Sequence, residues 1–275
     1  MGEAQRYLIR SRQTALDYQD CLANFLKFRA EGRLPAAGPY LRAEADEFLF
    51  LNSLTWQQKT LDQNRQALNK VLCLQLPRYN AGIPRRISSR AYTKEEVDLV
   101  VAQMSARHSM SVRLVAATGM RASELLSLAD IQEQPPSPDR PWLDHLFAGL
   151  ANCVVCTVRG KGGLFRQVAV PKALYQEINV LRYAHPVKVW DRRKPHSPTF
   201  DLVAGQALSQ AFTRASQKAL TFSFGVHGLR HAYVQRRLIE LQQHGFTLLE
   251  CLNICAQEVG HFRTEITTHY MTPRN

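Results

Sequence analysis

The sequence lacks any run of about 18 apolar residues, the length that a transmembrane helix needs. Its first residues, MGEAQRYLIRSR, also lack the apolar segment of a secretory signal peptide. The hydrophobic fraction of 45% over 275 residues still allows one or two globular domains with a sizeable core. These features predict a cytoplasmic protein that has no membrane partner.

Cysteine is sparse, with six residues scattered along the chain, which argues against a disulfide framework. Cys153-Val-Val-Cys156 looks like half of a zinc site, but no second pair stands at a suitable spacing. The pair lies in a β-branched run, where an odd spacing sends the two sulfurs to opposite faces of a strand. Cys251 and Cys255 are most simply core-facing thiols of a helix.

Carboxylates are missing from the C-terminal part of the chain in the arrangement that a two-metal nuclease requires. No aspartate follows Asp201, and the later glutamates at 240, 250, 258 and 265 are dispersed. Magnesium is therefore not expected to hold a phosphate here. We expect neither a metal site nor a cofactor.

Basic residues are in excess, with a formal charge of +12 and a pI near 9.7. A lysine or arginine that docks on a phosphate releases condensed counterions, so this charge points to a polyanionic partner. Ribosomal proteins, membrane-surface proteins and proteins with merely solvated basic surfaces share such a composition.

The first eighty residues are predicted to be helical. Tyr18, Leu22, Phe25 and Leu26 form one apolar stripe at helical spacing. A second helix is predicted to begin at Thr55, because Gln58 three residues later completes a capping-box pattern. That helix would turn its apolar positions inward, namely Leu61, Leu68, Val71 and Leu72.

A break in helical pattern between Pro77 and Ala91 predicts a linker, since the segment PRYNAGIPRRISSRA contains prolines, a glycine and several arginines. The predicted organisation is a helical domain at 1–84, a basic linker at 85–91 and a second domain at 92–275. Arg85, Arg86 and Arg90 are the linker's candidate residues for contacting a phosphate backbone, and a solvated charged loop is the alternative.

The second domain is predicted to open with a capping box at Thr93–Glu96, followed by inward residues Val97, Val100, Val101 and Met104. Further helices are predicted over 111–118, around Arg121–Leu128, from 171 to about 183, and over 207–219. Strands are predicted at 153–158 and 165–170, joined by a glycine-rich turn that carries Lys161.

The C-terminal region completes the prediction. A helix carries His227 and Arg230 and stops at Gly245, and another presents Leu248, Leu252, Cys255 and Val259. The segment WDRRKPHSP is predicted to be a loop. Thr264 would cap a short last helix that presents Tyr270.

The most informative residues are Arg121, the segment His227-Gly-Leu-Arg230-His231, Gly260-His261 and Tyr270. Two guanidiniums and two imidazoles can hold a phosphate and neutralise a pentavalent transition state, and a phenolic oxygen can attack phosphorus. Arg121 and Glu124, three residues apart, are also expected to pair. Each residue alone has an ordinary structural explanation, such as an ion pair or a helix cap.

In their order along the chain these motifs resemble the tyrosine site-specific recombinases, or phage-type integrases. The matching segments are Ala117-Thr-Gly-Met-Arg121-Ala-Ser-Glu124, Val158-Arg-Gly-Lys161, His227-Gly-Leu-Arg230-His231, and Val259-Gly-His261 with Tyr270 nine residues later. The resemblance covers roughly residues 90–275 closely and the first eighty only in general character. It implies a mainly α fold with a small β-hairpin or sheet (α+β), in which a helical N-terminal DNA-binding bundle precedes a mixed helical catalytic domain.

The resemblance implies catalysis through a 3′-phosphotyrosyl intermediate, without ATP, on double-stranded DNA with paired recombination sites held by a homo-tetramer. Tyr270 would be the nucleophile, Arg121 and Arg230 would hold the non-bridging phosphate oxygens, and His261 would donate a further hydrogen bond. His227 would accept or share the tyrosine proton. The hairpin lysine of the family, matched here by Lys161, would protonate the leaving 5′ oxygen, although Arg159 and Lys172 are nearby alternatives.

Two features depart from the family pattern. The stretch between Arg121 and Lys161 is longer than expected and contains the proline-rich segment 134–141, predicted to be a surface insertion. The sequence also ends soon after Tyr270, which leaves little room for a C-terminal helix that grips a neighbouring subunit. A type IB topoisomerase and a non-catalytic, sequence-specific DNA-binding protein remain the alternative functions.

Overall fold

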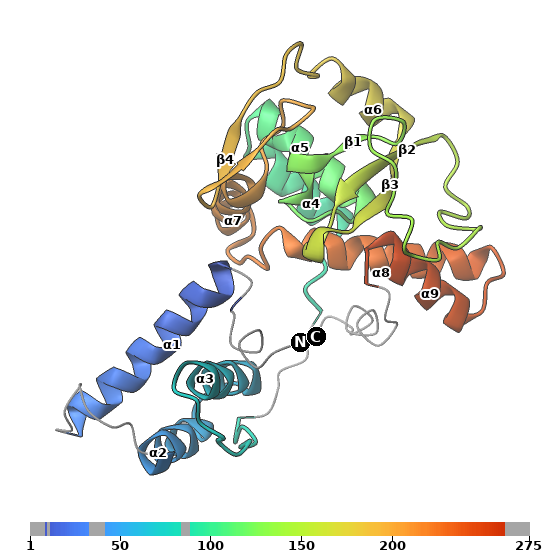
Figure 1. Cartoon of the computed structure of the whole chain (residues 1–275). Coiled ribbons are helices and arrows are strands. Elements are labelled where there is room, and N and C mark those ends of the chain that lie inside the picture. Colours follow the sequence, from blue (N-terminus) through green and yellow to red (C-terminus); the bar gives the residue numbers. More distant parts are fainter. Residues whose placement is uncertain (1–8, 10–11, 33–41, 84–88, 262–275) are drawn as a thin grey trace. The chain divides into compact units, whose positions relative to one another are not determined.

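The computed structural model describes residues 9, 12–32, 42–83 and 89–261 (Figure 1). The chain divides into two compact units, residues 1–87 and 88–275. Of the predicted residues, Arg85, Arg86, Thr264 and Tyr270 lie outside the described ranges.

Unit 1 is helical in its described part, as the sequence predicts, and its helices are α1 (Arg12–Glu31), α2 (Arg42–Ser53) and α3 (Gln58–Val71). Phe25, Leu61 and Leu68 are buried in one apolar cluster with Phe48 of α2. The ring of Phe48 packs edge-on against that of Phe25, with centroids 5.4 Å apart. Apolar side chains at helical spacing thus meet at the centre of the bundle.

The predicted start of the third helix at Thr55 is wrong. The backbone N–H groups of Thr55 and Trp56 donate back to the Asn52 carbonyl, at 3.2 and 2.8 Å, so both residues still complete the end of α2. Helix α3 begins at Gln58 instead. Val71, predicted to be inward, is the last residue of α3 and is 41% exposed.

Unit 2 is a mixed helical unit that carries a small sheet. Its elements are α4 (Lys94–Ala102), α5 (Ala106–Thr118), η2 (Glu124–Ser127), β1 (Ala129–Asp130), β2 (Cys153–Arg159), η3 (Lys161–Gly163), β3 (Phe165–Pro171), α6 (Lys172–Asn179), β4 (Val189–Asp191), β5 (Lys194–His196), α7 (Gly205–Leu220), α8 (His227–Gln243) and α9 (Leu248–Glu258). The predicted fold class is confirmed: helices dominate and the strands form small antiparallel sheets (Figure 1).

The larger sheet has the order β1-β2-β3, with Val158 of β2 opposite Arg166 of β3. Both predicted strands and the glycine turn between them are confirmed. Cys156 is buried whereas Cys153 is partly exposed. Within the described residues no helix is long and apolar enough to cross a membrane.

The core of unit 2 lies between this sheet and helices α4, α5 and α7. A second apolar cluster joins α8 to α9 and contains Val234, Leu241 and Cys255. The capping box of Thr93 and Glu96 is confirmed at the start of α4. The proline-rich segment also contacts the sheet, because the Ser137 hydroxyl accepts a hydrogen bond from the Phe165 N–H at 3.0 Å.

Three further predictions need correction. Arg121 is not on a helix, because its backbone N–H donates to the Glu124 carboxylate at 2.8 Å and only the 3-10 turn η2 follows. Helix α6 ends at Asn179 rather than near residue 183, since the Tyr183 N–H bonds the Thr199 carbonyl at 3.0 Å.

The predicted loop WDRRKPHSP contains a two-stranded hairpin, β4–β5. Helix α9 begins at Leu248 after a capping box formed by Thr247 and Glu250, and Leu248 itself is 46% exposed.

Candidate active site

Arg121 follows a tight turn whose shape is imposed by Gly119. Gly119 ends α5 with a φ of 64°, and a Cβ at this position would approach the Tyr233 ring to 2.4 Å. Only glycine combines this left-handed backbone with so close a contact. The turn is also held from α8, because Arg230 Nη1 donates to the Gly119 carbonyl at 2.7 Å.

Glu124 gathers arginines from three parts of the chain. Its carboxylate accepts Arg121 Nη1 at 2.6 Å and Arg166 Nη2 at 2.7 Å, and Arg230 Nη1 lies 4.0 Å away. Burial raises the pKa of Glu124, but the charges of Arg166, Arg230 and Arg121 outweigh it and lower the pKa to about 2. Glu124 is therefore ionised at every physiological pH, and it fixes the Arg121 guanidinium.

Arg230 and Arg166 reach from this carboxylate to the end of α9. Arg230 Nη2 donates to the Val259 carbonyl, and Arg166 Nη1 donates to the Glu258 carbonyl. Both arginine side chains are 0% exposed, whereas that of Arg121 is 25% exposed. Arg121 is thus the arginine of this group that solvent or a ligand meets first.

The Nε2 atom of His261 is the point where two guanidiniums converge. Arg121 Nη2 lies 3.3 Å from it and Arg230 Nη2 lies 3.2 Å from it. Burial and then the charges of Arg230 and Arg121 lower the pKa of His261 to about 3, so the ring is neutral at pH 7. Any hydrogen-bond acceptor at the position of His261 Nε2 is within reach of two cationic donors. An anionic oxygen, such as that of a phosphate, binds best between donors of this kind.

His227 begins α8 and lies one helical turn before His231, with ring centroids 5.3 Å apart. Burial lowers the pKa of each ring to about 4, assisted by the positive charge of Arg230 for His227 and by the neighbouring His227 for His231. We refer to His227, His231 and His261 as the three site histidines. A neutral His227 can accept a proton at pH 7.

Arg90 lies on the same side of unit 2. Its exposed guanidinium donates to the Phe224 carbonyl at 2.6 Å, three residues before the start of α8. Its charge also contributes to lowering the pKa of His227.

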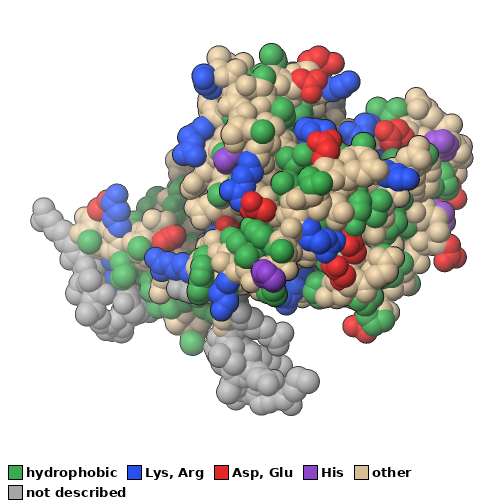
Figure 2. All heavy atoms as spheres, turned by 90° about the horizontal axis from the view of Figure 1, so that it is seen from above, with side chains coloured by type: hydrophobic (Ala, Val, Ile, Leu, Met, Phe, Trp, Pro, Cys, Tyr) green, Lys and Arg blue, Asp and Glu red, His purple; other side chains and the backbone are tan. Residues whose placement is uncertain are grey.

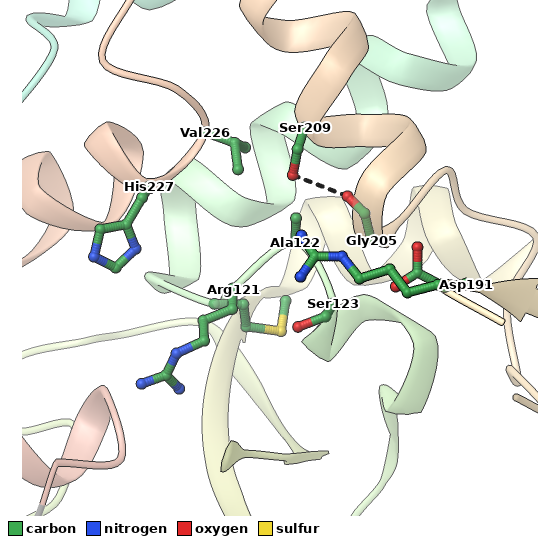
Figure 3. A pocket seen from close by; sticks show the side chains of 10 residues that line it. Arg121, Ala122, Ser123, Asp191, Gly205, Ser209, Val226 and His227 are labelled. Atoms are coloured by element: carbon green, nitrogen blue, oxygen red, sulfur yellow. Dashed lines mark hydrogen bonds between the residues drawn. The ribbon is translucent and has the colours of Figure 1, made fainter. Parts of the chain in front are cut away.

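Arg121 and His227 open onto one pocket with a volume of about 230 Å³, which is also lined by Asp191, Arg192 and Gly205. Figure 3 shows His227 and Arg121 at one end of this pocket and Asp191 at the other. The exposed edge of the arginine cluster is therefore accessible to a ligand.

The turn that carries Lys161 adjoins this cluster. Gly160, the residue before it, would place a Cβ 3.6 Å from Glu124 Oε1. Gly162 and Gly163 both have positive φ values, 86° and 91°. The described backbone thus places η3 beside the Arg121–Glu124 pair.

The structure brings together Arg121, Arg230 and His261 directly, with His227 and Arg90 next to them. Among the residues that it describes, no group of three or more His, Cys, Asp or Glu side chains is placed to hold a metal ion.

Sequence reasoning missed the buried residues behind this cluster. Glu258 accepts Arg237 Nη2 at 2.8 Å and the Tyr233 hydroxyl at 2.8 Å, and Arg237 also donates to the Ala148 carbonyl at 2.9 Å. Arg166 was missed as well, although alternation from the buried Val168 and Val170 places it on the inward face of β3.

The fold of this chain is similar to the folds of several solved structures. The XerH site-specific recombinase bound to difH substrate is 20% identical, with a TM-score of 0.56 over 92% of this chain and 74% of that one. A lambda integrase tetramer bound to a Holliday junction is 16% identical, with a TM-score of 0.57 over 99% of this chain and 76% of that one. The chain has the fold of the tyrosine recombinases.

The tyrosine recombinase fold extends to the Tn1549 transposon integrase in complex with transposon right end DNA. That structure is 12% identical, with a TM-score of 0.53 over 97% of this chain and 91% of that one. No protein-family model matches the chain, and no curated protein matches it in sequence. The likeness to tyrosine recombinases is thus one of fold.

Proposed function

We propose that the protein is a site-specific DNA recombinase, which cleaves and rejoins duplex DNA through a 3′-phosphotyrosyl intermediate formed by Tyr270. The observation that carries the proposal is the convergence of Arg121 and Arg230 on one acceptor position at His261, 3.3 and 3.2 Å away. The tyrosine recombinase fold supports it, because the neighbours in that fold include recombinase and integrase complexes with DNA.

The scissile phosphate would bind at the exposed edge of the arginine cluster. A non-bridging oxygen first meets Arg121, which is 25% exposed and oriented by Glu124. The Arg230 guanidinium is 0% exposed and lies 3.2 Å from His261 Nε2, so the phosphate would reach this second arginine only when His261 Nε2 moves out from between the two guanidiniums. The imidazole then contributes a hydrogen bond of its own to the phosphate.

The chemical step is an in-line displacement at phosphorus. The Tyr270 oxygen forms a bond to phosphorus, the bond to the 5′ oxygen breaks, and the phenolic proton passes to neutral His227. Lys161 gives a proton to the departing 5′ oxygen. The 5′ hydroxyl of a partner strand later attacks the phosphotyrosine and restores a phosphodiester, so no net bond energy is needed.

Electrostatics accounts for the need for several cations. A phenol with an ordinary pKa near 10 is ionised at pH 7 at a cost of about 4 kcal/mol. Two guanidiniums beside the phosphate stabilise both the phenolate and the pentavalent transition state. Loss of Arg121 should therefore slow cleavage on the order of a hundred- to a thousandfold.

We further propose that the partners are paired DNA sites and other copies of this chain, assembled as a tetramer on DNA. Arg85, Arg86 and Arg90 would follow the phosphate backbone near the site. Arg90 is supported by its exposed position, three residues before the N-cap of α4, and by its charge near His227.

Covalent capture tests the proposal. The wild type, Tyr270→Phe and Tyr183→Phe are incubated without metal with DNA fragments that flank the encoding gene, then denatured and precipitated. Tyr183→Phe is the matched control, because it removes a hydroxyl that only hydrogen-bonds Asp201, at 2.6 Å. We expect the wild type and Tyr183→Phe to retain DNA and Tyr270→Phe to retain none, with ends that map to one sequence.

Other outcomes separate the alternatives. Retention by Tyr270→Phe would remove the nucleophile assignment. No retention by any variant, together with tight binding of the same fragments, would favour a non-catalytic DNA-binding protein. Captured ends spread over all sequences, with relaxation of any supercoiled plasmid, would indicate a type IB topoisomerase.

A further inference from the structure

The hairpin β4–β5 ends in an unusual turn. Asp191 pairs with Lys194, so Arg192 and Arg193 alone form the connection. Their φ values are 47° and 61°. Two-residue hairpin turns with positive φ at both positions strongly prefer Asn-Gly, because most residues with a Cβ disfavour this backbone, whereas Asn tolerates it and Gly adopts it freely. A pair of arginines is a poor choice for the turn itself, and such strain tends to be kept where a side chain is functional.

This turn is fastened to the segment that carries Arg121. The Asp191 carboxylate accepts the backbone N–H of Gln206 at 2.8 Å at the start of α7. Gly205 permits this approach, because a Cβ there would lie 2.4 Å from Asp191 Cγ. The Gly205 N–H in turn donates to the Ala122 carbonyl at 2.8 Å, one residue after Arg121. The hairpin therefore has a defined position relative to the arginine cluster.

The side chains of the turn extend the positive charge of the site. Arg192 lines the same pocket of about 230 Å³ as Arg121 and His227. Arg193 and Lys194 follow it and are exposed. Within the described part of the chain neither turn arginine forms an ion pair or a hydrogen bond through its guanidinium. Both charges are thus available to an anion.

The turn presents Arg192, Arg193 and Lys194 as exposed residues in succession. On the face seen in Figure 2, Lys and Arg side chains are interspersed with Asp and Glu side chains. Three successive exposed cations on a hairpin tip therefore form a local concentration of charge. Asp191, the acid next to the turn in sequence, accepts a hydrogen bond from the Gln206 N–H at the start of α7.

We propose that the Arg192–Arg193 turn binds the DNA backbone at the phosphates next to the one held by Arg121. The inference rests on the proposed function, since it takes duplex DNA as the ligand of the pocket. Phosphates recur about every 3.4 Å of helix axis along each strand, so a strand whose scissile phosphate reaches Arg121 carries its next phosphates past the far wall of the pocket. Guanidiniums suit this contact, because their donors match phosphate oxygens.

The test replaces the turn by the sequence that its backbone prefers. The double variant Arg192→Asn with Arg193→Gly removes both charges and retains a turn with positive φ. The control is Lys188→Gln with Lys218→Gln, which removes two exposed charges of unit 2 outside the pocket. Each protein is titrated with duplex fragments flanking the encoding gene between 50 and 200 mM salt, and thermal unfolding is recorded.

We expect the negative slope of log affinity against log salt to become shallower by about 1.8 in the turn variant, because each lost phosphate contact removes about 0.9 from its magnitude. Between the lowest and the highest salt concentration, the fold-loss of affinity of the turn variant would thus be about ten times smaller than that of the wild type. The control should retain the wild-type slope, and the turn variant should unfold at the same temperature as the wild type or higher.

The outcomes distinguish this inference from the proposed function. Equal slopes for the turn variant and the wild type, with DNA binding intact, would overturn the role of the turn and leave the proposed function standing. Wild-type protein that binds no duplex even at 50 mM salt would overturn both. A turn variant that loses affinity through a lowered unfolding temperature would assign the arginines to the fold rather than to DNA.

Discussion

Replacing Arg166 with methionine should destabilise unit 2 strongly. Arg166 is 0% exposed, and its guanidinium joins the Glu124 carboxylate, at 2.7 Å, to the Glu258 carbonyl. Methionine retains an apolar stem of similar length but leaves Glu124 without one partner in a buried setting. Breaking a buried pair in this way costs about 3–5 kcal/mol. For a unit of this size the expected fall in Tm is about 6–20 °C.

The assay is thermal and urea unfolding, with Arg113→Met as the matched control. Arg113 makes two hydrogen bonds of 2.8 Å to Glu177, but the two side chains are 44% and 41% exposed. An exposed pair contributes less than about 1 kcal/mol to the free energy of unfolding. Similar losses in the two variants would refute the reasoning, because they would show that burial of the Arg166 pair does not determine its energy.

Two further predictions concern the turn at Gly119 and the response to acid. Gly119→Ala should lower the free energy of unfolding by about 2–5 kcal/mol, from backbone strain and the Tyr233 clash at 2.4 Å. In urea titrations Gly225→Ala, with a φ of 68° and no atom within 4 Å, should lose only about 1–2 kcal/mol, and equal losses would contradict the clash. Burial and neighbouring cations lower the pKa values of the three site histidines to about 4, 4 and 3, so the unfolded chain, with pKa values near 6.5, binds more protons in acid. Stability should therefore be complete above about pH 6.5 and decline as the pH falls toward 4, by about 2–3 kcal/mol at pH 5 after discounting for solvent screening. Glu124, with a pKa of about 2, should contribute little to this change, and urea unfolding that is equally stable at pH 7 and pH 5 would contradict the prediction.

Periodic apolar patterns predicted most of the described elements because burial of one helix or strand face determines them. The capping box at Thr93, both strands of the larger hairpin and the helix of His227 follow from such local signals. The β4–β5 hairpin has no apolar alternation, and its place depends on the bond from Asp191 to α7. Local sequence patterns therefore did not predict this hairpin, because its position depends on a contact between residues that are distant in sequence.

The candidate site was predictable where its residues lie close in sequence. Arg121 and Glu124, three residues apart, form the expected pair at 2.6 Å. The role of Arg166 was not predicted, because it depends on the fold bringing β3 against Glu124 and the end of α9. The convergence on His261 joins residues that are 140 positions apart, and only tertiary packing creates it.

The bond from Arg230 to Val259 bears on how mutations at the site should be interpreted. Val259 is the C-cap residue of α9, so a guanidinium there satisfies a terminal carbonyl and opposes the negative end of the helix dipole. An inactive Arg230 variant would therefore lose the hydrogen bond that caps α9 along with the proposed contact to phosphate. Arg121 is partly exposed and is bonded to a carboxylate rather than to a helix end, so a variant at this position would test the proposed binding of phosphate with less effect on folding.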